Sequence, residues 1–225
     1  MHIEPGVLDG IKFVLSYGTA AAAGAYAVKC GWDAAAEHGI ASLALRTIAA
    51  TGLVFAFFEV LPHYPVGVSE VHFILGSTLF LLFGVAPAAF GLAMGLFIQG
   101  AVFAPGDLPQ FFVNVTTLLV PLFAIEALAQ RIIPPHTPYV ELKYRHALAL
   151  STAYQGGVVA WVAFWVLYGG GLGAENLGAV LLFGVAYMLV IIVEPIVDLA
   201  VLALAKVLRN LSDYGLFTGR LHNPA

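Results

Sequence analysis

Long apolar stretches alternate with short polar turns along almost the whole chain. Stretches of about 17–25 apolar residues are long enough to span the hydrocarbon core of a bilayer, which is about 30 Å thick. A helix is expected in each stretch, because backbone exposed to lipid must satisfy its own hydrogen bonds. The pattern therefore predicts an all-α integral membrane protein with about seven transmembrane helices. The predicted spans are 11–30, 40–61, 70–84, 86–104, 111–133, 147–170 and 176–207.

The third and fourth of these spans are separated only by the turn at 84–87, which predicts a tight helical hairpin. The third span is short and begins in the polar patch Ser69-Glu70-Val71-His72. Because the sequence contains no soluble domain and no internal repeat, we expect one membrane domain over 1–225. Its helical bundle would cover 11–207, and a cytoplasmic tail would follow at 208–225.

Composition agrees with a membrane protein and excludes several functions. The chain is 61% hydrophobic and 10% charged, and its mean hydropathy of +0.94 lies outside the range of soluble domains. The net charge of −4 and the lack of a basic patch beyond the inner loops argue against a nucleic-acid partner. The sequence contains no Walker A phosphate loop, so we do not expect the chain to hydrolyse ATP.

The positive charges predict the orientation in the membrane. They cluster after the first, fifth and seventh spans, whereas the loops around 62–69, 105–110 and 171–175 carry no Lys or Arg. By the positive-inside rule the clustered side is cytoplasmic, so the N-terminus lies outside and the C-terminus inside. Lys12 falls outside this pattern. The expected location is the plasma membrane, the inner membrane where a cell has two. The clustered residues are Lys29, Arg46, Arg131, Lys143, Arg145, Lys206, Arg209 and Arg220.

The first residues of the chain have the chemistry of a metal ligand set. The Met1 amine, the His2 amide and the His2 imidazole can close fused chelate rings around one ion, and such nitrogen donors suit Ni(II), Cu(II) or Co(II). The simpler interpretation is an exposed terminal histidine, because chain termini are usually poorly ordered. Glu4 and Asp9 occupy the place where a signal peptide would be positive, so we expect the segment to be retained.

A second histidine, His72, lies inside a predicted span two residues after Glu70. An ionisable residue at membrane depth is costly and is therefore a candidate functional residue. The alternative is a histidine that bonds to a carbonyl of a neighbouring helix. His63, in the preceding outer loop, is a weaker candidate donor.

These features together resemble the CbiM/NikM family, the membrane-embedded substrate-binding (S) components of cobalt and nickel energy-coupling-factor transporters. Met1-His2-Ile3 followed by Gly6 is similar to the start of that family. Val68-Ser69-Glu70-Val71-His72, leading to Leu82-Phe83-Gly84, is similar to its histidine segment. Leu96-Phe97-Ile98-Gln99, Gly106 and Val113-Asn114-Val115 resemble its glutamine, its outer loop and its Asn-Val segment.

The resemblance implies a role for each matched residue. The Met1 amine, the His2 backbone nitrogen and the imidazoles of His2 and His72 would give four nitrogen ligands for Ni²⁺ or Co²⁺, with residues 1–10 as the metal-binding segment. Ligation requires loss of protons, so affinity should rise with pH. Gln99 and Asn114 would hold the N-terminal segment or orient an imidazole. Their alternative role is hydrogen bonding between helices.

The resemblance also implies partners. A transmembrane coupling subunit and cytoplasmic ATPase subunits would supply the energy, and a small accessory membrane protein is a further candidate. The family usually has Met-Glu at positions 4 and 5, where this chain has Glu4-Pro5, and Glu70 is also unusual. A carboxylate is a harder ligand than an imidazole, so one at either position would admit Co(II) or Zn(II) more readily. The sequence therefore leaves the identity of the metal open.

Two functions of other classes remain as alternatives. Glu194 and Asp198, one helical turn apart in the last span, could form the relay of a proton- or ion-coupled secondary carrier, or bond to neighbouring helices as a structural pair. His72, His63 and Glu70 could instead serve an integral-membrane metalloenzyme.

Small residues at Ala20/Gly24 and Ala21/Ala25 would let the first helix approach another closely. We expect this face to pack within the bundle. In S components such faces contact the coupling subunit, which is the alternative.

Overall fold

The computed structural model describes residues 3, 8, 10–61, 63–135 and 137–207, and these fold into a helical bundle with one small β-hairpin. Short 3₁₀ turns lie at Gly10–Lys12, Pro105–Gln110 and Tyr139–Glu141. The hairpin consists of β1 (Tyr64–Val66) and β2 (Ser69–Val71). The helices are α1 (Phe13–His38), α2 (Ile40–Glu59), α3 (Gly76–Phe83), α4 (Val85–Val102), α5 (Phe111–Ile132), α6 (Tyr144–Gly170) and α7 (Ala174–Val207).

The all-α membrane class is confirmed. In the described part of the chain, five helices are long and apolar enough to cross a membrane: α2, α4, α5 with its preceding turn, α6 and α7. Their outer faces expose large apolar side chains; Leu181 and Val185 on α7, for example, are 68% and 69% exposed. A helix with apolar residues on all sides is typical of a membrane span.

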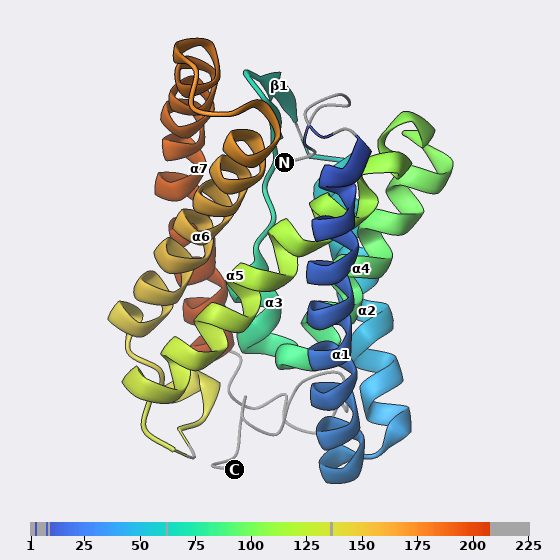
Figure 1. Cartoon of the computed structure of the whole chain (residues 1–225). Coiled ribbons are helices and arrows are strands. Elements are labelled where there is room, and N and C mark those ends of the chain that lie inside the picture. The colour runs from blue at the N-terminus through green and yellow to red at the C-terminus, as the bar shows by residue number, and fades with distance from the viewer. Residues whose placement is uncertain (1–2, 4–7, 9, 62, 136, 208–225) are drawn as a thin grey trace.

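The third predicted span, 70–84, is wrong as a helix. The chain is β-strand to Val71, has no regular secondary structure over 72–75, and becomes helical only in α3. An eight-residue helix is about 12 Å long, which is too short to cross a hydrocarbon core of about 30 Å. Figure 1 shows the non-helical stretch descending from the hairpin through the bundle to α3. The expected tight connection to α4 is present, and Gly84 alone separates the two helices, with a φ of 90°.

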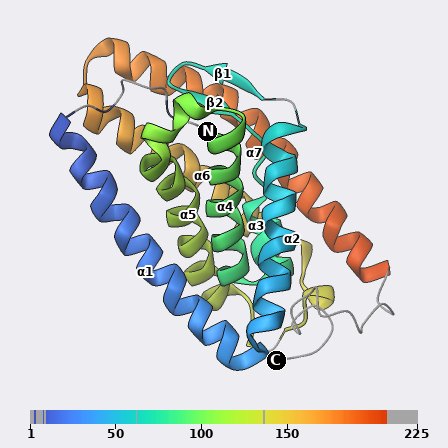
Figure 2. The same ribbon diagram turned by 90° about the vertical axis from the view of Figure 1, so that its right-hand side faces the viewer.

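The bundle is organised around α4 and α5. α2 packs along α4, α5 packs on α4 and α6, and α7 closes the far side against α6. In Figure 2, α1 runs along one flank and α7 along the other, with the remaining helices between them. The hairpin lies at one end of the bundle, and the α1–α2 and α3–α4 connections lie at the other (Figure 1).

The helices α2 and α4 approach each other closely at two glycines of α4. A Cβ on Gly91 would lie 2.5 Å from the Ala50 Cβ, and one on Gly95 would lie 2.5 Å from Val54 Cγ1. On α1, Ala21 and Ala25 are exposed, and a Cβ on Gly24 would meet nothing within 4 Å. Ala20, in contrast, packs against the core, so the expected intramolecular packing is found at Ala20 and is wrong for Ala21 and Ala25.

Lys12, the exception to the charge pattern, has a local explanation. Its Nζ donates to the carbonyl oxygen of Gly169 at 2.5 Å. Gly169 lies in the last turn of α6, where helix carbonyls lack intrahelical donors, and a lysine there satisfies one of them. Lys12 thus fastens the start of α1 to the end of α6.

Candidate functional site

The β-hairpin places His72 at the end of a short antiparallel pair. Tyr64 pairs with Val71 and Val66 with Ser69, around a turn at Gly67 and Val68. Gly67 has a φ of 64°, and a Cβ there would lie 2.7 Å from the Ala179 carbonyl oxygen on α7. Only glycine meets both demands without strain. The hairpin is therefore held against α7, and the chain leaves β2 one residue before His72.

His72 is buried and bonded to a carboxylate. Its side chain is 1% exposed, and its Nε2 lies 2.8 Å from Glu70 Oε2, whose side chain is 26% exposed. Metal-ligating histidines commonly bond a carboxylate through the second ring nitrogen, which fixes the ring orientation. His72 and Glu70 already have this arrangement.

Two aromatic rings pack against His72. The His63 ring stacks on it with centroids 4.9 Å apart and planes 14° apart, and Phe58 of α2 meets it edge-on at 5.5 Å. The nitrogen lone pairs of an imidazole lie in the plane of its ring. In two stacked imidazoles they therefore point along parallel planes and not toward one shared ion. This geometry supports a packing role for His63.

The N-terminal segment approaches the hairpin at Ile3. Ile3 is fully buried, forms an antiparallel β-bridge with Ser69, and donates its backbone N–H to Asn114 Oδ1 at 2.9 Å. Its side chain packs in a small apolar cluster with Val113 and Trp165. Asn114, predicted to hold the N-terminal segment, therefore bonds it directly at residue 3. The predicted site residues Met1, His2 and Glu4 lie outside the described residues.

Gln99 lies next to Asn114 but does not bond Ile3. Both amides border a small cavity of about 10 Å³ between α4 and α5, close to the smallest volume that holds one water molecule. Gln99 is 6% exposed, and its Oε1 has no hydrogen-bond partner among the described residues. Its role remains a prediction.

Glu194 and Asp198, the candidate relay, are buried on α7 and bonded to the chain. Glu194 accepts hydrogen bonds from the backbone N–H groups of Ile74 and Leu75, the latter at 3.2 Å, and from Gln155 Nε2. Asp198 accepts one from Ser77 Oγ at 2.5 Å. These contacts favour the interpretation as structural groups, because Glu194 bonds the stretch between His72 and α3 and Asp198 bonds α3 itself.

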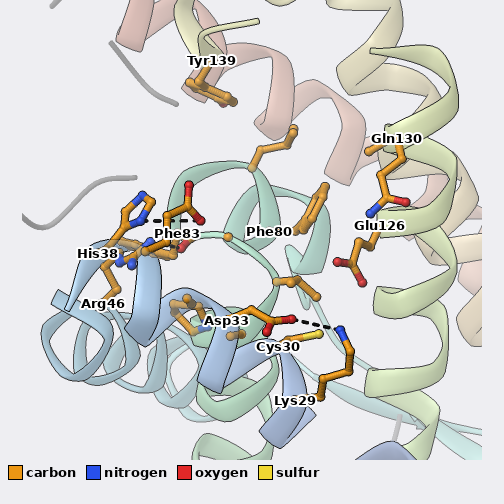
Figure 3. Close-up of a pocket in the computed structure, with 18 of the residues that line it drawn as sticks. Lys29, Cys30, Asp33, His38, Arg46, Phe80, Phe83, Glu126, Gln130 and Tyr139 are labelled. Atoms are coloured by element: carbon orange, nitrogen blue, oxygen red, sulfur yellow. Dashed lines mark hydrogen bonds and ion pairs between the residues drawn. The ribbon is translucent and has the colours of Figure 1, made fainter. Parts of the chain in front are cut away.

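A cavity at the opposite end of the bundle is lined by none of the predicted site residues. Its volume is about 570 Å³, and charged groups of α1, α2 and α5 line it (Figure 3). Lys29 pairs with Asp33 at 2.9 Å, and Arg46 Nη1 donates to the Phe83 carbonyl oxygen at 3.0 Å. The second contact satisfies the C-terminal end of α3. Lys29 and Asp33 thus bond each other, and Arg46 bonds α3.

Sequence reasoning missed Ile3 and Ser69, the residues that join the N-terminal segment to the hairpin. The available signal was Tyr64, Val66 and Val68 alternating around Pro65 and Gly67, a pattern typical of a hairpin. In the described part of the chain, no group of three or more His, Cys, Asp or Glu side chains is arranged to hold a metal ion.

Fold and site together define an integral membrane protein with a buried histidine directly after the strand that pairs with Ile3. A sequence model for the CbiM family, the cobalt uptake substrate-specific transmembrane region, matches residues 2–211. The chain therefore belongs to this family, and the predicted resemblance is confirmed. Among curated proteins and solved structures, no match is found. Family membership assigns the chain to the transmembrane part of a metal-uptake system.

Proposed function

We propose that the chain is the substrate-binding (S) component of an energy-coupling-factor importer and captures Ni²⁺ or Co²⁺ for ATP-driven uptake. The observation that carries this proposal is the position of Ile3, which is bonded to both Asn114 and the strand that leads to His72. In an antiparallel pair the two chains run in opposite directions. The chain preceding Ile3 is therefore expected to run from the level of Ser69 toward His72.

The proposed ligands are the Met1 amine, the His2 backbone nitrogen and imidazole, and the His72 imidazole. Two residues of chain reach at most about 7 Å beyond Ile3, so the anchoring of Ile3 limits where the first donors can lie. Four nitrogen donors suit Ni²⁺ and accommodate Co²⁺. Glu70 would orient the His72 ring, and its carboxylate could favour Co²⁺.

The supporting residues have separate tasks in this proposal. Asn114 holds the N-terminal segment through Ile3, Gln99 supports it from α4, and His63 packs on the His72 ring. Glu4 is a further candidate ligand or orienting group. Residues 1–10 form the metal-binding segment, 11–207 the bundle and 208–225 the cytoplasmic tail of one membrane domain.

We propose an orientation with the N-terminus outside and the C-terminus inside a plasma or inner membrane, with seven crossings. Residues 70–74, which precede the left-handed Leu75, cover about 17 Å when extended, and α3 adds about 12 Å. Their sum matches a hydrocarbon core of about 30 Å, so this composite segment can serve as the third crossing. Non-helical backbone at membrane depth is tolerated where protein buries it.

Energy would come from other subunits. A transmembrane coupling subunit and cytoplasmic ATPase subunits are the proposed partners, with a small accessory membrane protein as a further candidate. The exposed Ala21 and Ala25 on α1 are consistent with a contact to the coupling subunit, since small residues let helix backbones approach.

The test is equilibrium binding of Ni²⁺ and Co²⁺ to purified protein that begins at Met1. A variant with one additional residue before Met1 displaces the amine and should lose tight binding, and His72→Ala should do the same. His38→Ala is the control, because His38 lies at the other end of the bundle. Unchanged binding by the extended protein would overturn the amine ligand and with it the proposed site.

A further inference from the structure

The stretch between His72 and α3 is non-helical backbone that runs through the bundle, and its N–H groups need acceptors. An unsatisfied backbone group in this environment is costly. Ile74 and Leu75 both donate to the same atom, Oε1 of Glu194. Glu194 is fully buried on α7, and its other oxygen accepts from Gln155 Nε2 of α6. The Glu194 side chain therefore accepts the backbone hydrogen bonds of two consecutive residues of the stretch.

The backbone at this point is strained. Leu75 has φ 52° and ψ 34°, the left-handed conformation, which leucine rarely adopts. Such a residue keeps this conformation only where its surroundings enforce it. The next residue, Gly76, lies so close to α6 that a Cβ would be 2.2 Å from Tyr154 Cζ. Glu194 and Tyr154 thus fix the backbone from two sides, two to four residues beyond His72.

We propose that Glu194 is a positioning residue for the metal site. Its carboxyl oxygen holds Ile74 and Leu75, and because only Phe73 separates Ile74 from His72, this contact sets where the His72 imidazole lies. The inference rests on the proposed function, in which His72 binds the ion. The role requires an oxygen acceptor at this point and does not require an ionisable group.

This requirement separates the positioning role from a proton relay. Glutamine at 194 keeps an oxygen for the two backbone N–H groups. Its new amide N–H can be met by Gln155, whose Oε1 has no hydrogen-bond partner among the described residues. Glu194→Gln should therefore behave like the wild type, whereas Glu194→Ala should not. A relay through Glu194 would be disabled equally by both substitutions.

The experiment measures Ni²⁺ affinity and the visible absorption spectrum of bound Ni²⁺ on purified protein beginning at Met1. We expect E194A to weaken binding by about tenfold or more and to alter the spectrum, and we expect E194Q to retain both. Asp198→Ala is the matched control, because Asp198 is 1% exposed on the same helix and bonds Ser77 inside α3. D198A should lower the unfolding temperature without changing the affinity or the spectrum.

Several outcomes would overturn the positioning role. They are wild-type affinity and spectrum in E194A, loss of Ni²⁺ binding in a folded E194Q, or equal losses of affinity in E194A and D198A. Should E194A not fold, loss of Ni²⁺ binding in a folded E194Q would still overturn the role. His72→Ala in the same series tests the proposed function separately. Wild-type binding by H72A would refute the site itself, whereas a loss confined to H72A would refute only the role of Glu194.

Discussion

At the residue scale, the sequence singled out polar candidate residues but not the apolar residue that anchors the N-terminal segment. His72, Glu70 and Asn114 stand out in the sequence because polar groups at membrane depth are rare. Ile3 does not stand out, since an apolar residue near a chain end carries no signal. Its backbone N–H donates to Asn114, 111 positions away, and such long-range pairing leaves no periodicity to detect.

Asn114→Ala removes the acceptor of the Ile3 N–H and should weaken Ni²⁺ binding by about 10–100-fold. It should also lower the free energy of unfolding by about 1–3 kcal/mol, because a buried N–H loses its partner. Asn114→Asp keeps an oxygen and should bind more tightly than the alanine variant. The control is Thr117→Ala on the same helix, whose hydroxyl bonds only Val113 within α5. Metal titration of the three variants checks this, and equal affinities in N114A and T117A would contradict it.

At the element scale, six of the seven predicted spans correspond to long helices, and the third does not. Hydropathy reports how apolar a segment is, and 70–84 is apolar because the bundle buries it on all sides. It cannot report backbone conformation, which here depends on Glu194, 120 residues from Ile74. The close packing of α2 on α4 could not be predicted either. It depends on Gly91 and Gly95, and glycines occur along most of the chain, so the sequence does not single these two out.

Gly91→Ala should destabilise the protein by about 1–3 kcal/mol, as overpacking does in a close-packed core. The added Cβ would lie 2.9 Å from the backbone carbonyl carbon of Ala50, which cannot move without shifting α2. Gly52→Ala is the control on the facing helix, because its Cβ would meet nothing within 4 Å. That change should be neutral or stabilise by about 0.5–1 kcal/mol. Denaturant unfolding in detergent measures both, and similar shifts in the two variants would show that α2 and α4 are not so close.

At the scale of the whole molecule, the two ends of the bundle differ in chemistry. One end carries the hairpin (Figure 1), with Ile3 paired to it and His72 directly after it. The other end carries the charged cavity with Lys29, Asp33 and Arg46 (Figure 3). The positive-inside rule assigns the charged end to the cytoplasm. An importer of this orientation would meet its ion at the hairpin end, on the outside.

Labelling of single cysteines by a membrane-impermeant thiol reagent tests this orientation. The native Cys30 is buried and is first replaced by serine. Tyr64→Cys in the hairpin and Ile40→Cys at the start of α2 are a matched pair, because the native side chains are 67% and 77% exposed. We expect Tyr64→Cys to react in intact cells and Ile40→Cys only after the membrane is opened. The reverse pattern would place the hairpin in the cytoplasm, and His72 would then face the compartment into which an importer releases its ion.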